Sequence, residues 1–225
     1  MKLFYHATGL LAAFCLMCAI LVTAVEAVVY WNDGYFEKEY RKYNVLRHVP
    51  MEMNSLLYVT EEMMDYLRGD RKDLNIQVPI NGRIQEFFNE KEKRHMNDVK
   101  ELFLAAERLR TQGLWTAALA GLLLLWRRQI GILLRTLQWG VGLFLAAVGT
   151  IAFLAAASFT KYFTWFHLLL FDNNDWLLNP ATDRLINIVP EGFFRDTAFL
   201  IAGIFLAAAF LLWLAARLLD KRFVN

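Results

Sequence analysis

The chain has 225 residues, of which 57% are hydrophobic and 20% are charged, and its formal net charge at pH 7 is +2. Such an apolar excess excludes an ordinary soluble domain and indicates a membrane protein. The near-neutral charge, with no tract rich in lysine and arginine, argues against nucleic acid as a partner. Most charged residues crowd into residues 32–110, so apolar helices are expected on either side of that region.

Four apolar segments have lengths that suit a bilayer core of roughly 30 Å, which takes about 20 helical residues. They cover about 7–29, 113–126, 136–160 and 198–216. The second is short as a strictly apolar stretch, and we expect it to use the preceding amphipathic turns, "LFLAAERLRTQ", to reach the interface. The expected fold is therefore an all-α integral membrane protein with a single membrane domain and four transmembrane helices.

The N-terminal segment is interpreted as an uncleaved anchor rather than a signal peptide. Its apolar run is longer than the apolar region of a signal peptide, and no small-x-small cleavage site precedes Glu26. Cys15 and Cys18 lie in this run with CxxC spacing, but no second CxxC and no βαβ pattern supports a redox or metal site. We expect both cysteines to act as small apolar residues that face lipid or a neighbouring helix.

Positive charge in short loops predicts the orientation of the chain. Basic residues stand at the N-terminus, between the second and third spans, and after the fourth: Lys2, Arg127, Arg128, Arg135, Arg217, Lys221 and Arg222. These regions, and with them both termini, are expected to be cytoplasmic. Residues 32–110 and 161–196 are then extracytoplasmic.

The extracytoplasmic region 32–110 is too poor in glycine, serine and proline for a linker, and we expect it to be mostly helical. "EMNSLLYVTEEMMDYLRGD" carries apolar residues at helical spacing, and Gly69 is expected to end that helix. Its candidate buried residues are Leu56, Leu57, Met63, Met64 and Leu67. "NIQVPING" is extended, and its Asn81-Gly82 pair favours a turn or short hairpin. A further helix is expected to start near Glu92 and to continue into the second span.

On that further helix, His95 and Asp98 are three residues apart and therefore share one face. Asp98 could accept a hydrogen bond from the imidazole, which would fix its tautomer and raise its basicity. The alternative is a solvated helical face with a routine histidine–aspartate contact. Taken alone, the spacing favours this plainer alternative.

The second extracytoplasmic segment, 161–196, contains "FHLLLFDNNDW" and is too apolar and aromatic for a loop in water. We expect short interfacial helices or a re-entrant piece at the outer leaflet. His167 would then lie on the same side of the membrane as His95, where two imidazoles can divide the roles of base and acid in acyl transfer. No GxSxG or HExxH motif and no outer-face cysteine nucleophile competes with this assignment.

Two stretches of the chain resemble a known family. "HMNDVK", which begins at His95, and "FHLLLFDNNDWLLNPATDRLINIVPEGFF", residues 166–194, are similar to the signature of the bacterial lipoprotein intramolecular transacylases. The second motif is long and specific, and the layout of four spans with a large first outer loop extends the resemblance to essentially the whole chain. The resemblance implies an acyltransferase of the cell membrane of Gram-positive bacteria. Such an enzyme moves the sn-2 acyl chain of a diacylglyceryl-cysteine lipoprotein to its free α-amine and so produces the N-acyl, S-monoacylglyceryl lyso form.

The resemblance places the family's functional histidines at His95 and His167 and implies no cofactor. We expect His167 to be the general base, and His95, oriented by Asp98, to donate to the oxyanion or to the leaving oxygen. The residues expected to support the site are Asp98, Asn173, Trp176 and Asp183. The implied partners are a diacylated lipoprotein and membrane lipid, and the chain is expected to work as a monomer with its active site at the extracytoplasmic face.

Two other functions stay open from the residues alone. An outer-leaflet lipid hydrolase would use the same histidines with water as the acceptor and would release free fatty acid. A non-catalytic lipid-binding accessory protein would need the aromatic segment only as an interface anchor. A metal site of His95, Asp98 and His167 is disfavoured because no further histidine or cysteine is expected near it.

Overall fold

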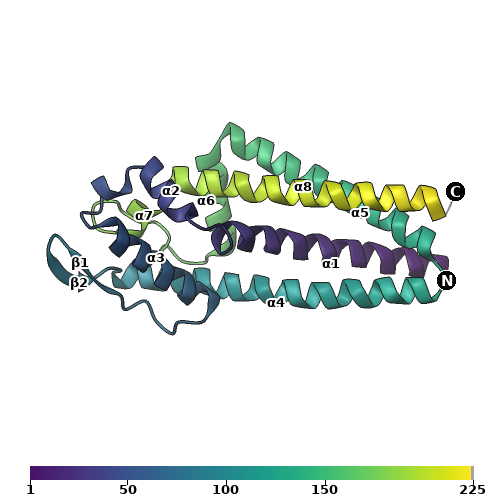
Figure 1. Ribbon diagram of the computed structural model, residues 1–225, viewed down its shortest axis with the longest axis horizontal. Helices are drawn as coiled ribbons and strands as arrows, with labels where there is room; N and C mark the ends of the chain where they lie inside the picture. The colour runs from purple at the N-terminus through teal and green to yellow at the C-terminus, as the bar shows by residue number, and fades with distance from the viewer. Residues whose placement is uncertain (224–225) are drawn as a thin grey trace. The chain divides into compact units, whose positions relative to one another are not determined.

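The computed structural model describes residues 1–223. Most of these residues are helical, and the chain divides into two compact units. The bundle unit comprises residues 1–27, 106–157 and those from 199 onward, and the site unit comprises residues 28–105 and 158–198. Helices α1, α4 and α8 each contribute residues to both units (Figure 1).

The bundle unit consists of long helices: α1 (Lys2–Val29), the second part of α4 (Glu90–Trp126), α5 (Ile130–Ala157) and most of α8 (Glu191–Phe223). At 1.5 Å per residue, α1 and α5 are each about 42 Å long, which exceeds the thickness of a bilayer core. Within residues 1–223, three helices are long and apolar enough to cross a membrane, namely α1, α5 and α8 up to Arg222.

The expected count of four spans is not confirmed, because α4 is not among those three helices. The apolar end of α4, the expected span 113–126, follows Arg108 and Arg110 within the same helix. Helix limits also differ from expectation, since α5 begins at Ile130 and α8 at Glu191. Helical backbone continues through polar residues at the ends of an apolar run, so the apolar run alone underestimates the length of the helix.

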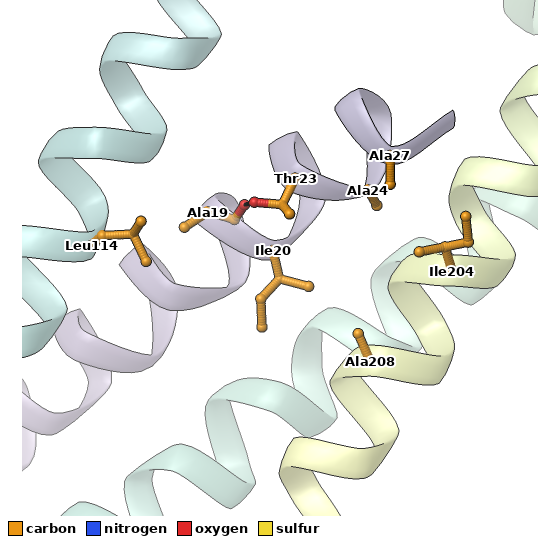
Figure 2. Close-up of a pocket in the computed structure, with 8 residues that line it drawn as sticks. All are labelled: Ala19, Ile20, Thr23, Ala24, Ala27, Leu114, Ile204 and Ala208. Carbon is orange, nitrogen blue, oxygen red and sulfur yellow. Dashed lines mark hydrogen bonds between the residues drawn. The ribbon is translucent and has the colours of Figure 1, made fainter. Parts of the chain in front are cut away.

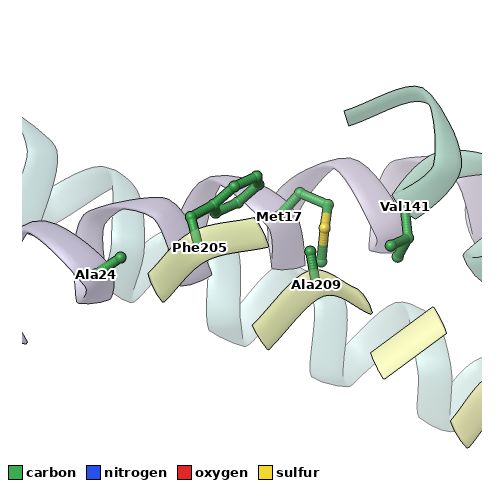
Figure 3. Packing of buried hydrophobic residues seen from close by; sticks show 5 residues of the cluster. All are labelled: Met17, Ala24, Val141, Phe205 and Ala209. Carbon is green, nitrogen blue, oxygen red and sulfur yellow. The ribbon is translucent and has the colours of Figure 1, made fainter. Parts of the chain in front are cut away.

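Helix α1 supplies much of the core of the bundle unit. Met17 and Ala24 of α1, Val141 of α5, and Phe205 and Ala209 of α8 form one buried apolar cluster (Figure 3). A larger share of the apolar stretch is buried in α1 than in α5 or α8. These contacts make α1 the helix around which the others pack in this unit.

Two glycines allow α1 and α5 to approach closely. A Cβ atom at Gly9 would lie 2.2 Å from the Thr136 hydroxyl oxygen, and one at Gly140 would lie 2.5 Å from the Cβ of Ala13. Between membrane helices, close packing of this kind depends on small residues, because there is no hydrophobic driving force between surfaces that lipid also solvates.

An ion pair between Glu26 and Arg110 joins α1 to α4 within the bundle unit. Both side chains are largely shielded from solvent, and opposite charges in such surroundings stabilise each other where a lone charge would be strongly unfavourable.

Cys15 and Cys18 are free thiols of intermediate exposure.

The site unit is made of shorter elements. They are α2 (Tyr35–Lys42), η1 (Val45–Arg47), α3 (Met53–Arg68), β1 (Gln77–Ile80), β2 (Arg83–Glu86), the first part of α4, α6 (Phe159–Leu170), α7 (Leu185–Ile188) and the start of α8. The all-α expectation therefore needs one correction, because the unit contains a two-stranded antiparallel sheet.

The hairpin lies where the Asn81-Gly82 pair indicated a turn. Both residues have positive φ angles, 52° and 74°, as a two-residue type I′ hairpin turn requires. Ile80 pairs with Arg83 across this turn. Val78 and Ile80 on β1 are buried, which secures the register of the pair.

Helix α3 follows its sequence pattern closely. Leu56, Met63, Met64 and Leu67 are buried, and Leu57 is half-buried. Gly69 follows α3 with a φ of 92° and so ends it as expected, because a left-handed residue terminates the helical hydrogen bonding.

Candidate active site

The first turn of α4 is fixed by a capping box, in which the side chain and backbone of two residues bond reciprocally. The Asn89 side chain accepts a hydrogen bond from the Glu92 N–H at 3.0 Å, and the Glu92 carboxylate accepts one from the Asn89 N–H at 2.7 Å. Both orphan N–H groups are thereby satisfied, so the helix begins at Glu90, two residues before the expected start. This start sets the direction in which every side chain of the next turns points, including that of His95.

Glu92 also connects α4 to the chain that precedes α8. Its second carboxylate oxygen accepts a hydrogen bond from the Leu185 N–H at 2.5 Å. The side chain is almost wholly buried, and burial raises the pKa of Glu92 although the N–H groups of Leu185 and Asn89 oppose that shift. One carboxylate therefore joins two segments that lie far apart in the sequence.

Asp183, expected to support the site, is buried and anchors the loop before α7. It accepts hydrogen bonds from the Asn89 side chain at 2.9 Å, the Asn179 N–H at 2.7 Å and the Thr182 hydroxyl at 3.1 Å. Lys91 lies 3.6 Å from the same carboxylate. Burial by itself would raise the pKa of Asp183, but these hydrogen bonds outweigh it and hold the pKa below its ordinary value. Its contacts are those of a residue that shapes the loop.

His95 on α4 and His167 in the last turn of α6 face one another in the site unit. Their ring centroids are 6.2 Å apart and their planes are inclined by 34°. Each residue is 8% exposed, so both rings are almost enclosed by protein. The structure thus brings together the two histidines expected to act together.

The tautomer of His167 follows from one contact. Its Nδ1 lies 2.7 Å from the backbone carbonyl oxygen of Phe163. A carbonyl oxygen only accepts, so Nδ1 carries the hydrogen and donates it. In the neutral ring, Nε2 is then left with the lone pair, and it is the nitrogen that can take up a proton.

Aromatic side chains surround the two imidazoles. Trp176 stacks on the His167 ring at 4.9 Å and 28°, and Phe163 meets the same ring edge-on at 4.4 Å. Phe171 lies against both rings, with centroids 5.2 Å from His95 and 5.6 Å from His167. These rings restrict the imidazoles and keep the space around them poor in water.

His95 differs from His167 in its polar contacts. Its Nδ1 is buried and has no hydrogen-bond partner in the part of the chain that the structure describes. Burial, followed by the positive charge that His167 can carry, lowers the pKa of His95 from 6.5 to about 4. The ring is therefore neutral near pH 7 and has a buried nitrogen available to a substrate.

We expect the His95 ring to remain neutral down to about pH 5, since its pKa lies near 4. In an unfolded chain histidine protonates near its ordinary value of 6.5. The stability gained by burying the neutral ring is therefore complete above pH 6.5 and is lost as the pH falls toward 4. Nitrogen chemical shifts of histidine-labelled protein in micelles should show His95 titrating well below 6.5, with His95→Gln used to assign its signal. A midpoint at or above 6.5 would contradict this expectation.

Asp98 does not make the hydrogen bond to His95 that its spacing suggested. Its carboxylate accepts a hydrogen bond from the Asn173 side chain at 2.8 Å instead. The negative charge of Asp98 still favours protonation of His95, but burial outweighs it. Of the two neighbouring asparagines, Asn173 thus makes a side-chain hydrogen bond to α4.

Two residues of the site region, Arg94 and Asp175, were not singled out from the sequence. The Arg94 guanidinium donates two hydrogen bonds to the Asp175 carboxylate, at 2.8 and 3.0 Å. The sequence indicates only the α4 half of this contact, because Lys91, Arg94 and Asp98 share a helical face at spacings of three and four. Which residues would meet that face depends on the fold.

Metal ligands do not gather at this site. Residues 1–223 contain no group of three or more histidine, cysteine, aspartate or glutamate side chains that could hold a metal ion. The chemistry available in the site unit is that of two imidazoles, their aromatic surroundings and the polar groups that position them.

A separate apolar pocket of about 230 Å³ lies in the bundle unit between α1, α4 and α8 (Figure 2). It is lined by Ala19, Ile20, Thr23, Ala24, Ala27, Leu114, Ile204 and Ala208. The Thr23 hydroxyl donates a hydrogen bond to the Ala19 carbonyl at 2.8 Å. Its polarity is thereby largely satisfied within α1, so the pocket suits a hydrocarbon chain.

Comparison with known proteins agrees with this picture. Among solved structures, the membrane-integral lipoprotein intramolecular transacylase Lit of Bacillus cereus is similar with a TM-score of 0.80 at 21% identity, covering 99% of this chain and 98% of that chain. A variant of that protein with a histidine replaced by arginine gives 0.77 at 22% identity, covering 98% and 94%. A variant with a histidine replaced by alanine gives 0.78 at 22% identity, covering 98% and 96%. No curated protein matches the chain in sequence.

The structural likeness shows that the fold is that of a membrane-integral protein. The family model described as lipoprotein intramolecular transacylase Lit matches residues 10–194 of this chain. That match spans most of the chain and includes both sequence motifs, so it confirms the family that those motifs indicated. The chain belongs to the lipoprotein intramolecular transacylase family, Lit.

Proposed function

We propose that this chain transfers the sn-2 acyl chain of a diacylglyceryl-cysteine lipoprotein to the free α-amine of the same cysteine. The product is the N-acyl, S-monoacylglyceryl lyso form. Beyond family membership, the observation that carries this proposal is the pair of nearly enclosed imidazoles, His95 and His167, with centroids 6.2 Å apart. Donor and acceptor belong to one molecule, so the transfer needs orientation and proton movement but no covalent acyl-enzyme.

In the proposed reaction the α-amine nitrogen attacks the sn-2 ester carbonyl. The new C–N bond forms as the glycerol C–O bond breaks. The Nε2 atom of His167 takes the proton from the attacking amine. This nitrogen is free because Nδ1 makes the hydrogen bond to the Phe163 carbonyl. The proton then passes to the departing glycerol oxygen, so that the enzyme ends the cycle unchanged.

His95 is proposed to stabilise the charge that develops on the carbonyl oxygen. A neutral imidazole carries one N–H, and its buried Nδ1 has no partner among the described residues. A donor held in apolar surroundings interacts strongly with an oxyanion and needs little reorganisation when the charge appears. Asp98 contributes through its charge and through its bond to Asn173, not by a hydrogen bond to this ring.

The aromatic surroundings support transacylation over hydrolysis. Trp176, Phe163 and Phe171 cover the two imidazoles and limit the access of water. An excluded-water site protects an activated ester from attack by water and holds amine and ester in reacting geometry. The apolar pocket between α1, α4 and α8 is a candidate for an acyl chain of the substrate or of the surrounding lipid (Figure 2).

We further propose that the chain crosses the membrane four times, with the end of α4 as the second span and both termini in the cytoplasm. Within the bundle unit, the start of α1, the end of α8 and the connection between α4 and α5 lie at one end (Figure 1). The basic residues at that end support a cytoplasmic position, and the site unit would then be extracytoplasmic. Because one chain supplies both histidines, a monomer suffices for the reaction.

Mass spectrometry tests this function. A lipoprotein with a diacylglyceryl-cysteine should be incubated with the purified protein in micelles, and its N-terminal lipopeptide analysed. We expect an acyl chain to move from glycerol to the α-amine with no change in total mass, because the transfer is an isomerisation. Release of free fatty acid would indicate a hydrolase instead. An unchanged lipopeptide would contradict the proposal.

A further inference from the structure

The segment 172–178, which follows α6, is attached to one face of α4 by three successive contacts. Asp98 accepts a hydrogen bond from Asn173, Arg94 binds Asp175, and the Lys91 ammonium donates to the carbonyl of Leu177. Lys91, Arg94 and Asp98 recur at helical spacing, so the contacts form a line along α4 in the site unit. The middle contact, between Arg94 and Asp175, lies next to Trp176 in the sequence.

The middle contact is the best defined of the three. Arg94 Nε lies 2.8 Å from one Asp175 oxygen, and Arg94 Nη2 lies 3.0 Å from the other. Two parallel bonds between planar groups fix orientation as well as distance. The Asp175 N–H also donates to the Asn173 side chain at 2.9 Å, which links this pair to the bond between Asn173 and Asp98.

Trp176 directly follows Asp175 and stacks on the His167 ring. A tryptophan at this position can swing away from the imidazole unless the backbone beside it is held. The two hydrogen bonds between Arg94 and Asp175 hold that backbone against α4, the helix that also carries His95. The position of Trp176 over His167 is therefore fixed by α4, the same helix that carries His95.

We propose that Arg94 and Asp175 are positioning residues for the transacylation. They hold Trp176 on the His167 ring and so keep the two imidazoles in a fixed relative orientation. The inference rests on the proposed function, since it assigns these residues a role in that reaction. Neither residue is a catalytic residue, because the Arg94–Asp175 pair acts through Trp176. The pair is partly exposed, and an exposed ion pair contributes little to global stability, so its loss should act on geometry and not on folding.

The test uses the full-length protein in micelles and four variants: Arg94→Ala, Asp175→Asn, Arg94→Asp with Asp175→Arg, and Arg94→Lys. Single-turnover rates on the diacylated lipopeptide should fall by roughly tenfold or more in Arg94→Ala and Asp175→Asn, with KM nearly unchanged, because misplacement of about 1 Å can cost up to about a hundredfold. The charge-reversed double variant should recover part of the lost rate. Lysine cannot form the bidentate contact, so Arg94→Lys should recover less than the reversed pair.

A second readout reports on the stacking itself. In histidine-labelled protein, the Cε1 proton of His167 should be shifted upfield by the ring current of Trp176, and Trp176→Leu should remove that shift. Arg94→Ala and Asp175→Asn should also reduce this upfield shift of the His167 Cε1 proton. This measurement does not depend on turnover, so a failure of the proposed function and a failure of this inference are distinguishable.

A control is available on α2, where the exposed Arg41 guanidinium donates two hydrogen bonds to one oxygen of Glu37, four residues away. Glu37→Ala should leave both the rate and the His167 signal unchanged. If Arg94→Ala and Asp175→Asn both keep the wild-type rate and the wild-type His167 chemical shift, the proposal is overturned. A loss of rate with an unaltered His167 signal would also overturn it, because the pair would then act by another route. If Arg94→Ala fails to fold, Arg94→Lys and Asp175→Asn provide the same comparison.

Discussion

Replacing His167 with alanine should lower the rate of acyl transfer by about 10²–10⁴-fold, the range that a positioned acid–base group contributes. Alanine removes Nε2, the nitrogen that is free to take the amine proton because Nδ1 donates to the Phe163 carbonyl. The measurement is the initial rate of conversion of a diacylated lipopeptide, followed by mass spectrometry of the N-terminal fragment.

His48→Ala is the control for this substitution, because His48 is exposed and lies outside the site. It should convert substrate at the wild-type rate. His167→Gln is informative in addition, since an amide can replace the hydrogen bond to Phe163 but cannot take up a proton at neutral pH. Activity of His167→Ala or His167→Gln close to wild type would remove His167 from the proposed mechanism.

Replacing Glu92 with alanine should destabilise the fold strongly. The buried carboxylate accepts hydrogen bonds from the N–H groups of Asn89 and Leu185. Each buried N–H left without an acceptor costs about 1–3 kcal/mol, so the free energy of unfolding should fall by several kcal/mol. Thermal unfolding in micelles, followed by circular dichroism, should show a clearly lower midpoint than wild type.

Glu90→Ala is the matched control for Glu92→Ala, because Glu90 lies in the same helical turn with an exposed side chain. It should unfold close to the wild-type temperature. Glu92→Gln keeps one acceptor oxygen and should fall between alanine and wild type. If Glu92→Ala unfolds at the same temperature as Glu90→Ala, the hydrogen bonds of Glu92 between α4 and the chain before α8 contribute little to the free energy of unfolding.

The expected effects of Glu92 and of Arg94 differ because their surroundings differ. Glu92 is almost wholly buried, so its unpaired partners cannot turn to water. Arg94 has a side chain that is 61% exposed, so water can replace its contacts. The first substitution is therefore expected to alter stability, and the second to alter geometry around His167.

Much of the local structure could be read from the sequence because its causes are local. Gly69 ends α3 and Asn81-Gly82 makes the hairpin turn, since each supplies a backbone conformation that other residues adopt at a cost. The apolar pattern located α1, α5 and α8, although polar residues extend these helices beyond the apolar runs. The same pattern predicted the end of α4 as a further span, which is not confirmed, because this apolar end is short and follows two arginines.

The amino-acid sequence by itself determined the family, through two motifs whose residues need only be read in order, and it identified His95 and His167 as the chemical groups of interest. Only the tertiary structure decided what surrounds them. Asp98 bonds to Asn173, 75 residues away, and Glu92 bonds to Leu185, 93 residues away. Helical spacing shows which side chains share a face of α4, but the partner of that face is set by how the segment after α6 packs on it. For that reason the spacing puts Asp98 on the same face of α4 as His95, but it does not show that Asn173 is the hydrogen-bond partner of Asp98.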